Sequence, residues 1–311
     1  MTTSTARVPL RGPYDLREVA LMGFGHRDEE TFDGVMRLGF CVDGAHETQA
    51  GVAVRQDSGA LTVTVEQLVG PPVDPDPITA QAARVVSADQ DGQAYADLCR
   101  ADPVLAPIFA RAPGFRPANF HSPYEAAIWS IVSARRPRSQ GIALRQRLAE
   151  AYGTVLTVAG QPVPVVPTPS RLLEVDQLPG LPADRIPRLH AIAEAAQRGD
   201  LAVDHLTALG VDAARTELQR LPGIGPFYSS LITVRACGLT DVLATEPQVL
   251  KHLEAAYGRR VDAEELEQLA EAWRPWRTWV TVMLRALSGR ADAGGCHRLA
   301  GLSPAARAVG R

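Results

Sequence analysis

Residues 221–238 read LPGIGPFYSSLITVRACG, and the fold of the chain follows from this stretch. The helical pattern of Ala213–Arg220 ends at Leu221, the first residue of this stretch. Glycines at 223 and 225 then let the chain turn tightly with positive φ. Pro226 suits the first position of the next, apolar helix, because its missing N–H would have no intrahelical partner there. The pattern predicts two helices joined by a short glycine-rich hairpin.

A hairpin of this kind presents backbone N–H groups at a helix N-terminus, and these can hold a phosphate oxygen without Lys or Arg. Glycines also let a nucleic-acid backbone approach closely, in a contact that fixes position and carries no base sequence. We therefore predict that Leu221, Gly223 and Gly225 contact DNA. The alternative is a plain connection between two helices with no ligand, which two glycines alone would favour.

The composition is that of an ordinary globular chain. Of its 311 residues, 46% are hydrophobic and 22% charged, enough for two or three domains. The net charge of −3 does not by itself indicate nucleic-acid binding, so DNA contact would need a local basic face or backbone donors. Neither a bilayer-spanning apolar run nor the apolar core of a signal peptide is present, and we expect a cytoplasmic, nucleoid-associated protein.

The cysteines and histidines give no sign of a metal or cofactor. The four cysteines have no CxxC pair, which argues against a disulfide framework, a zinc site or an iron–sulfur cluster; they are Cys41, Cys99, Cys237 and Cys296. We expect reduced, buried or incidental thiols and no bound cofactor.

The pattern along the chain changes near residue 80. Before it, alternation predicts strands at Val35–Val42, Gly51–Arg55 and Leu61–Glu66, with a hairpin turn at 57–59 between the last two. The segment 70–77, GPPVDPDP, marks a junction. Beyond it the spacing is helical, with a helix-loop-helix over 123–152, a proline-rich loop at 162–169, a helix capped by Ser170, and helices at 187–198 and 212–220.

Three longer segments share an order and spacing with a known family. They are YEAAIWSIVSARRPRSQGIALRQRLAEAYG (124–153), DVLATEPQVLKHL (241–253) and LAEAWRPWRTWVTVMLRAL (269–287). Together with the hairpin, they make the chain resemble DNA-3-methyladenine glycosylase II, a helix-hairpin-helix DNA glycosylase, from about residue 13 to 288.

The resemblance implies an α+β architecture. It implies a small N-terminal α/β domain over 1–85, a helix-hairpin-helix glycosylase domain of two helical subdomains over 86–288, and a flexible tail over 289–311. A cleft between the helical subdomains would take an extruded base. Such enzymes act on double-stranded DNA with a damaged base, remove alkylated bases by cutting the N-glycosidic bond in base excision repair, and need no cofactor. We expect a monomer.

Pro247 occupies the position of the family's catalytic Asp, and proline has no carboxylate to take over that role. A carboxylate beside the sugar would stabilise the positive charge that develops as the bond breaks. Glu246, one position earlier, is the candidate, and Pro247 would hold it extended. The alternative is that the catalytic acid is lost and the chain is a weak or inactive damaged-DNA-binding protein. Asp241 is expected to be structural.

Further residues follow from the same resemblance. Arg135 falls on the wedge that fills the gap left by a flipped base, and we expect Arg135, Arg136, Arg138 and Lys251 to contact DNA, although a solvated basic loop is the alternative. The base pocket is assigned to Phe227, Trp129 and Arg285.

These pocket positions carry alternatives of their own. Phe227 could equally be a core residue. Arg285 replaces a pocket tryptophan and would disfavour a cationic base. The three tryptophans at 273, 276 and 279 are expected to pack the C-terminal helix. No lysine lies in 221–238, so a monofunctional enzyme without strand cleavage is predicted.

Overall fold

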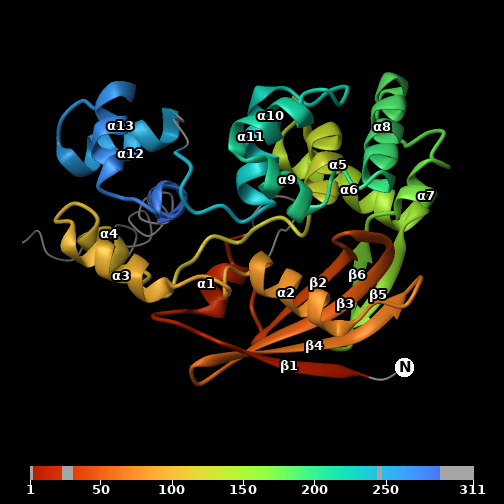
Figure 1. The fold of residues 1–311 in the computed structure, drawn as a ribbon, viewed down its shortest axis with the longest axis horizontal. Helices are drawn as coiled ribbons and strands as arrows, with labels where there is room; N and C mark the ends of the chain where they lie inside the picture. The colour runs from red at the N-terminus through yellow and green to blue at the C-terminus, as the bar shows by residue number, and fades with distance from the viewer. Residues whose placement is uncertain (1–2, 23–30, 244–246, 288–311) are drawn as a thin grey trace, which may run out of the picture. The chain divides into compact units, whose positions relative to one another are not determined.

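The computed structural model describes residues 3–22, 31–243 and 247–287 (Figure 1). The chain forms two compact units, Met1–Ala94 with Gly114–Thr240, and Tyr95–Pro113 with Asp241–Arg311. These units divide the chain at other points than the expected domain limits at 85 and 288, because the chain leaves the first unit after Ala94 and re-enters it at Gly114. None of the helices in the described part is long and apolar enough to cross a membrane.

A four-stranded antiparallel sheet forms the N-terminal part of the first unit, which confirms the α+β class. Its strand order is β1 (Ser4–Pro9), β4 (Ala60–Val69), β3 (Ala45–Asp57) and β2 (Val35–Val42). The predicted hairpin is present: β3 and β4 pair up to Asp57 and Ala60, and Gly59 turns the chain with a φ of +70°. The turn leaves two residues between the strands, as a tight hairpin requires.

One face of this sheet packs against two helices. Side chains alternate along β2, so Met36, Leu38 and Phe40 are buried against α1 (Leu16–Ala20) and α2 (Pro75–Val85). Figure 1 shows α2 lying across the sheet. The predicted junction at 70–77 is shorter than expected, because its last prolines occupy the first turn of α2, where a missing N–H costs nothing.

The other face of the sheet carries a second hairpin that the sequence pattern did not predict. Strands β5 (Thr154–Val158) and β6 (Gln161–Val165) pair antiparallel, so the prediction of a loop from 162 was wrong for 162–165. The prolines at 162 and 164 alternate along β6, so both missing N–H groups face away from β5. Gly39 and Gly51 pair across the sheet beneath this hairpin, and a Cβ at Gly39 would lie 2.6 Å from Val163 Cγ1.

Helices build the rest of the first unit. The predicted helix-loop-helix is confirmed as α5 (Pro123–Ser133) and α6 (Arg138–Tyr152). The remaining helices are α7 (Pro169–Leu172), the 3₁₀ turn η1 (Ala183–Arg185), α8 (Ile186–Gln197), α9 (Val203–Leu209), α10 (Val211–Leu218) and α11 (Pro226–Arg235). Ser170 is not a cap, since Thr168 precedes α7 and the Ser170 hydroxyl donates to Glu47 at 2.8 Å instead.

The second unit is a small helical cluster around aromatic side chains. It contains α3 (Gly92–Ala101) from Tyr95 on, α4 (Ala106–Phe109), α12 (Pro247–Tyr257), α13 (Ala263–Glu271) and helical residues 277–287. The Tyr95 ring lies 5.0 Å from Trp279 and 5.9 Å from Trp276. All three tryptophans, Trp273 included, are at least nine-tenths buried, which confirms that they pack this core.

Three of the four cysteines are described, and they are buried free thiols, as expected: Cys41, Cys99 and Cys237. Burial raises the pKa of the Cys99 thiol, and likewise that of Cys237, to about 12. Neither thiol is therefore activated as a nucleophile at neutral pH. Cys296 lies outside the described residues.

Glu125 is a buried carboxylate that ties α5 to β2 and α6. Its Oε1 accepts a hydrogen bond from the Cys41 amide at 3.1 Å, and its Oε2 lies 3.1 Å from both His121 Nδ1 and Arg145 Nη2. Burial works to raise the pKa of Glu125, but the charges and hydrogen bonds of His121 and Arg145 outweigh it and hold the pKa below its ordinary value.

Replacing Glu125 by Gln should lower the free energy of unfolding by about 3 kcal/mol at neutral pH, because Arg145 is left buried without its carboxylate. Because the folded-state pKa of Glu125 is lowered, this carboxylate stabilises the fold above the ordinary glutamate pKa of about 4.3, and the contribution is lost as the pH falls through the folded-state pKa. The stability difference between wild type and Glu125→Gln should therefore shrink in acid, which denaturant titrations across a pH series measure.

The control variant is Glu217→Gln, which removes the exposed Arg220–Glu217 ion pair and should lower the free energy of unfolding by less than about 1 kcal/mol. A Glu125→Gln difference that stays constant into acid would contradict this account.

Candidate nucleic-acid interface

The predicted hairpin joins α10 to α11 in the first unit. The Leu221 amide donates to Leu218 O and the Ile224 amide to Leu221 O, each at 3.1 Å, which closes two successive tight turns. Gly223 has a φ of +94°, in the left-handed region that favours glycine. Ile224 is buried and anchors the turn in the core, so the glycines on either side of it remain at the surface.

The hairpin leaves a group of backbone N–H donors unpaired. Within the part of the chain that the structure describes, no acceptor faces the amides of Gly223, Gly225, Phe227 and Tyr228. Pro226 contributes no N–H, and the Gly225 carbonyl accepts the Ser229 amide at 2.9 Å to start α11. These donors stand at the positive end of the helix dipole of a ten-residue helix. The arrangement is suited to an anion such as a phosphate.

Glycine is required at 223 for reasons of space as well as conformation. A Cβ there would lie 2.9 Å from Ile131 Cδ1 and 3.0 Å from Arg188 Cδ. The hairpin therefore packs directly on α5 and α8. At Gly225, by contrast, the backbone is extended and no atom lies within 4 Å of a built Cβ.

Phe227 is not a core residue. Its side chain is 62% exposed, so the core alternative left open by the sequence is excluded. Its ring meets that of Tyr228 edge-on at 5.1 Å, and the Tyr228 hydroxyl lies 3.2 Å from Ser133 Oγ at the end of α5. An exposed aromatic ring therefore stands beside the unpaired amides, where it is free to stack on a base.

The loop between α5 and α6 lies next to this hairpin through the Ser133–Tyr228 contact. Arg135 is exposed at its tip with a φ of +57°, a conformation that costs a non-glycine residue about 1 kcal/mol. Arg136 is half-buried, and Arg138 is exposed as the first residue of α6. The loop that carries the three predicted arginines therefore starts next to the hairpin.

Trp129 lies in the core of the first unit. It is 7% exposed, and the built Cβ of Gly141 would lie 3.0 Å from its Cη2. The close approach of α6 over this ring accounts for its burial. Its assignment to a base pocket stays a prediction.

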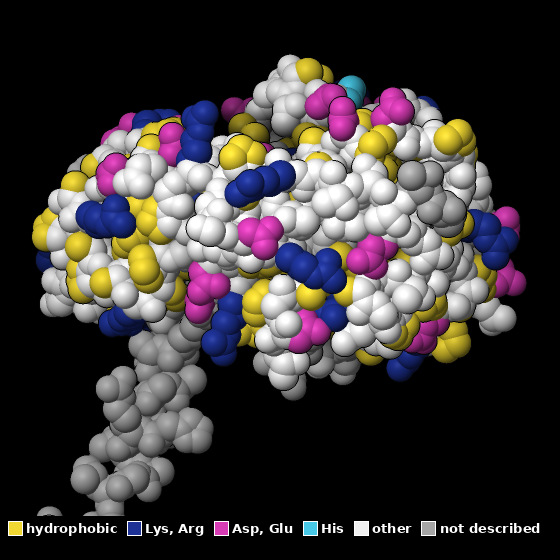
Figure 2. Space-filling model, turned by 90° about the horizontal axis from the view of Figure 1, so that it is seen from below, with side chains coloured by type: hydrophobic (Ala, Val, Ile, Leu, Met, Phe, Trp, Pro, Cys, Tyr) yellow, Lys and Arg dark blue, Asp and Glu magenta, His cyan; other side chains and the backbone are white. Residues whose placement is uncertain are grey.

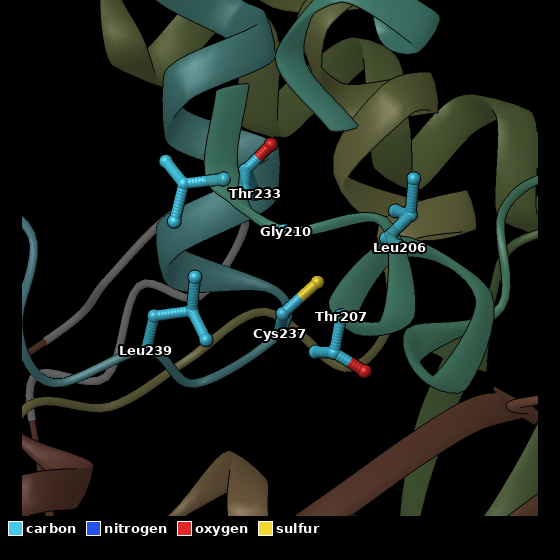
Figure 3. Close-up of a pocket in the computed structure, with 7 residues that line it drawn as sticks. Leu206, Thr207, Gly210, Thr233, Cys237 and Leu239 are labelled. Atoms are coloured by element: carbon cyan, nitrogen blue, oxygen red, sulfur yellow. The ribbon is translucent and has the colours of Figure 1, made fainter. Parts of the chain in front are cut away.

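A small cavity lies between the end of α11 and the junction of α9 and α10 (Figure 3). Its volume is about 70 Å³, and it is lined by Leu206, Thr207, Gly210, Val211, Thr233, Cys237 and Leu239. Pockets that enclose a whole ligand have volumes of roughly 300–1,000 Å³. This cavity is therefore too small to hold a nucleobase.

The remaining candidates belong to the second unit. Glu246 lies outside the described residues, and Pro247 is the first residue of α12. Lys251 on α12 and Arg285 within helical residues 277–287 are exposed. Asp241 is structural, as expected: its Oδ1 pairs with Arg277 Nε at 2.5 Å and its Oδ2 with Arg274 Nη1 at 2.8 Å.

Among the described residues, no group of three or more His, Cys, Asp or Glu side chains is placed to hold a metal ion. Charged side chains of both signs are interspersed on the face seen in Figure 2. Any attraction for DNA therefore has to come from local groups of arginines and from unpaired backbone amides rather than from the net charge.

The sequence relatives are DNA repair proteins. No protein-family model matches the chain. Over 169 residues, 52% of its length, the chain is 28% identical to a protein from two strains of Mycobacterium tuberculosis described as "Probable bifunctional transcriptional activator/DNA repair enzyme AlkA". The chain spans about a third, 33%, of the length of these curated relatives.

Solved structures match over nearly the whole chain. The 3-methyladenine DNA glycosylase of Archaeoglobus fulgidus superposes with a TM-score of 0.71 at 18% identity, over 90% of this chain and 97% of that one. The 8-oxoguanine glycosylase/lyase of Clostridium acetobutylicum, in complex with double-stranded DNA, superposes with a TM-score of 0.63 at 14% identity, over 91% and 93% of the two chains.

The chain therefore has the fold of the helix-hairpin-helix DNA glycosylases. Within that class, it is similar in structure to the archaeal 3-methyladenine glycosylase and in sequence to AlkA. The resemblance inferred from residues 13–288 is confirmed by these similarities.

Replacing Gly223 by Ala should lower the free energy of unfolding by about 1–3 kcal/mol, because the new methyl group meets Ile131 and the positive φ is strained. The displaced hairpin should also bind an undamaged duplex less tightly, as fluorescence anisotropy would show. Gly225→Ala is the matched control, since its Cβ enters open space, and its stability should stay within about 0.5 kcal/mol of wild type. Equal loss of stability in both variants would refute this interpretation of the turn.

Proposed function

We propose that this chain is a monofunctional DNA glycosylase of base excision repair, which flips a damaged base out of duplex DNA and hydrolyses its N-glycosidic bond. The observation that carries the proposal is the set of unpaired amides at an exposed glycine hairpin, on a chain with the glycosylase fold. These donors can grip the sugar–phosphate backbone without sequence preference, as a search for damage requires. We further propose that it acts as a monomer on nucleoid DNA in the cytoplasm.

The proposed substrate is an alkylated base. The archaeal structural neighbour is named a 3-methyladenine glycosylase, and the Mycobacterium relative a DNA repair enzyme. Alkylation weakens the bond to the sugar by making the base a better leaving group. The exposed ring of Phe227 is proposed to stack on the extruded base, since stacking accepts bases of any sequence context.

The proposed chemistry needs one carboxylate, and we assign it to Glu246. As the bond between C1′ and the base nitrogen breaks, its electron pair leaves with the base and positive charge develops on the sugar. A carboxylate beside the sugar stabilises this charge and takes a proton from the water that forms the new C1′–O bond. Pro247 follows directly in the sequence, and a residue before proline is disfavoured in helical conformations.

Wild-type protein should release base from methylated duplex DNA under single-turnover conditions, and Glu246→Gln should release it about a hundredfold more slowly or worse, because the carboxylate is lost. Chromatography of the freed bases measures this, with a duplex containing 8-oxoguanine run in parallel. Glu264→Gln changes an exposed carboxylate on α13 and should leave the rate unchanged. If Glu246→Gln releases base as fast as wild type, Glu246 is not the catalytic carboxylate. Selective binding of damaged duplex by the wild type, without any base release, would instead favour a non-catalytic damage-binding protein.

No covalent adduct should form when the protein is incubated with damaged duplex and borohydride, because α10, α11 and their hairpin contain no lysine to form a Schiff base. Gel electrophoresis of the labelled duplex detects such an adduct. Lys251, the single lysine of the chain, is proposed as a phosphate contact, so Lys251→Gln tests any adduct that does appear. An adduct that requires Lys251 would mean that the enzyme also cuts the strand.

A further inference from the structure

Beside the hairpin, the structure holds a group of arginines of which only Arg136 was expected from the sequence to contact DNA. We propose that Arg188, Arg185 and Arg136 form a second phosphate site, which binds a neighbouring phosphodiester of the DNA strand held by the hairpin amides. The inference rests on the proposed DNA binding and adds side-chain contacts to it.

Arg188 connects this group to the hairpin. Its Cδ and Nη1 lie 3.0 and 3.4 Å from the position of a Cβ built on Gly223. The side chain extends from the first turn of α8, is 36% exposed, and pairs with Asp184 at 2.9 Å. Its guanidinium therefore lies within a few ångströms of the glycine whose amide is unpaired.

Arg185 is fixed in place by the end of α5. Its Nη1 donates to Ile131 O at 2.6 Å, and its Nη2 to Ala134 O at 3.4 Å. These carbonyls belong to the last turn of α5 and to the loop that follows, at the negative end of the helix dipole. Moving the Arg185 side chain away would leave these two carbonyl oxygens without a donor. The positive charge of Arg185 is therefore fixed beside the end of α5.

Arg136 approaches the same place from the α5–α6 loop. Its amide donates to Ser133 O at 3.1 Å, which curls the loop back towards α5. Its Nε is buried, and within the described residues it has no hydrogen-bond partner. The side chain as a whole is half-buried, and its positive charge acts on Arg185.

The charges in this group repel one another. Burial lowers the pKa of Arg185 most, and the neighbouring charges of Arg136, Arg188 and Arg135 lower it further, while Asp184 opposes them. One carboxylate does not balance four guanidinium groups. An anion bound between them would relieve the repulsion.

A phosphodiester is the anion that fits this place. A DNA strand carries one phosphate per about 3.4 Å of helix axis, so a strand held at Gly223 brings another phosphate beside Arg188. A guanidinium fork matches two phosphate oxygens. Arg188, which is partly exposed and lies beside Gly223, joins the two anion sites, as a continuous backbone requires.

The test uses full-length protein and an undamaged duplex, with affinity measured by fluorescence anisotropy between about 50 and 200 mM salt. Arg188→Gln should weaken binding about tenfold or more, the effect expected when one charge-assisted hydrogen bond is removed. The slope of log K against log salt should fall by about 0.9, the value for a single neutralised phosphate. Arg188→Lys should keep most of that slope, because it keeps the charge.

Two further variants make the result decisive. Arg136→Gln removes a loop member of the group without touching the Arg188–Gly223 packing, and it should lower both affinity and slope in the same way. Arg198→Gln is the matched control, because Arg198 lies at the other end of α8 with Asp200 as its partner, and its binding should equal wild type. The preference for damaged over undamaged duplex should be unchanged in all variants, since phosphate contacts carry no base information.

If wild type binds duplex while Arg188→Gln and Arg136→Gln keep its affinity and slope, the second phosphate site is wrong and the proposed function stands. If wild type does not bind duplex at all, the proposed function fails, and this inference fails with it.

Discussion

The left-handed turn at Gly223 makes the proposed DNA-binding surface possible. A residue with a side chain would collide there with Ile131 and Arg188, and would also be strained at a φ of +94°. Because glycine permits both the close packing and the turn, the next residues can start α11 with their amides unpaired and exposed. The anion-binding property of this surface is thus a by-product of how tightly two helices can be joined.

The rest of the first unit holds that turn against a rigid support. Helix α5 lies beneath the hairpin, and its own position is fixed by buried polar contacts at its start. Glu125 links it to β2 and α6, while Gln81 of α2 donates to Cys41 O at 3.1 Å and to His121 O at 3.0 Å. Buried hydrogen bonds of this kind favour one arrangement of elements, because each alternative would leave a donor or acceptor unpaired. The sheet therefore contributes to the proposed DNA site indirectly, through the placement of α5.

The charge distribution explains how a chain of net charge −3 can be built to meet a polyanion. Backbone amides carry no net charge, and the arginines near them are gathered by tertiary contacts with α5, α8 and the α5–α6 loop. Acidic and basic side chains are interspersed on the face seen in Figure 2. The field that a DNA strand would meet is local, and the total charge says little about it.

Short sequence patterns were sufficient to predict the local elements: the β3–β4 hairpin, the α5–α6 pair, and the turn between α10 and α11. Alternation, helical spacing and glycines between helices act within a few residues, so no knowledge of distant segments is needed to interpret them. The β5–β6 strands were not predicted because prolines at alternate positions suggest a loop. That their missing N–H groups face away from the ladder is visible only beside the partner strand.

The sequence also suggested Phe227 and the loop arginines as site residues but left open whether Phe227 was buried. The exposure of Phe227, and the approach of Arg188 to Gly223, 35 residues further along the chain, depend on the tertiary structure. The contacts of Arg188 depend on how α8 packs against α5 and the hairpin, and packing between distant segments leaves no local signature in the sequence.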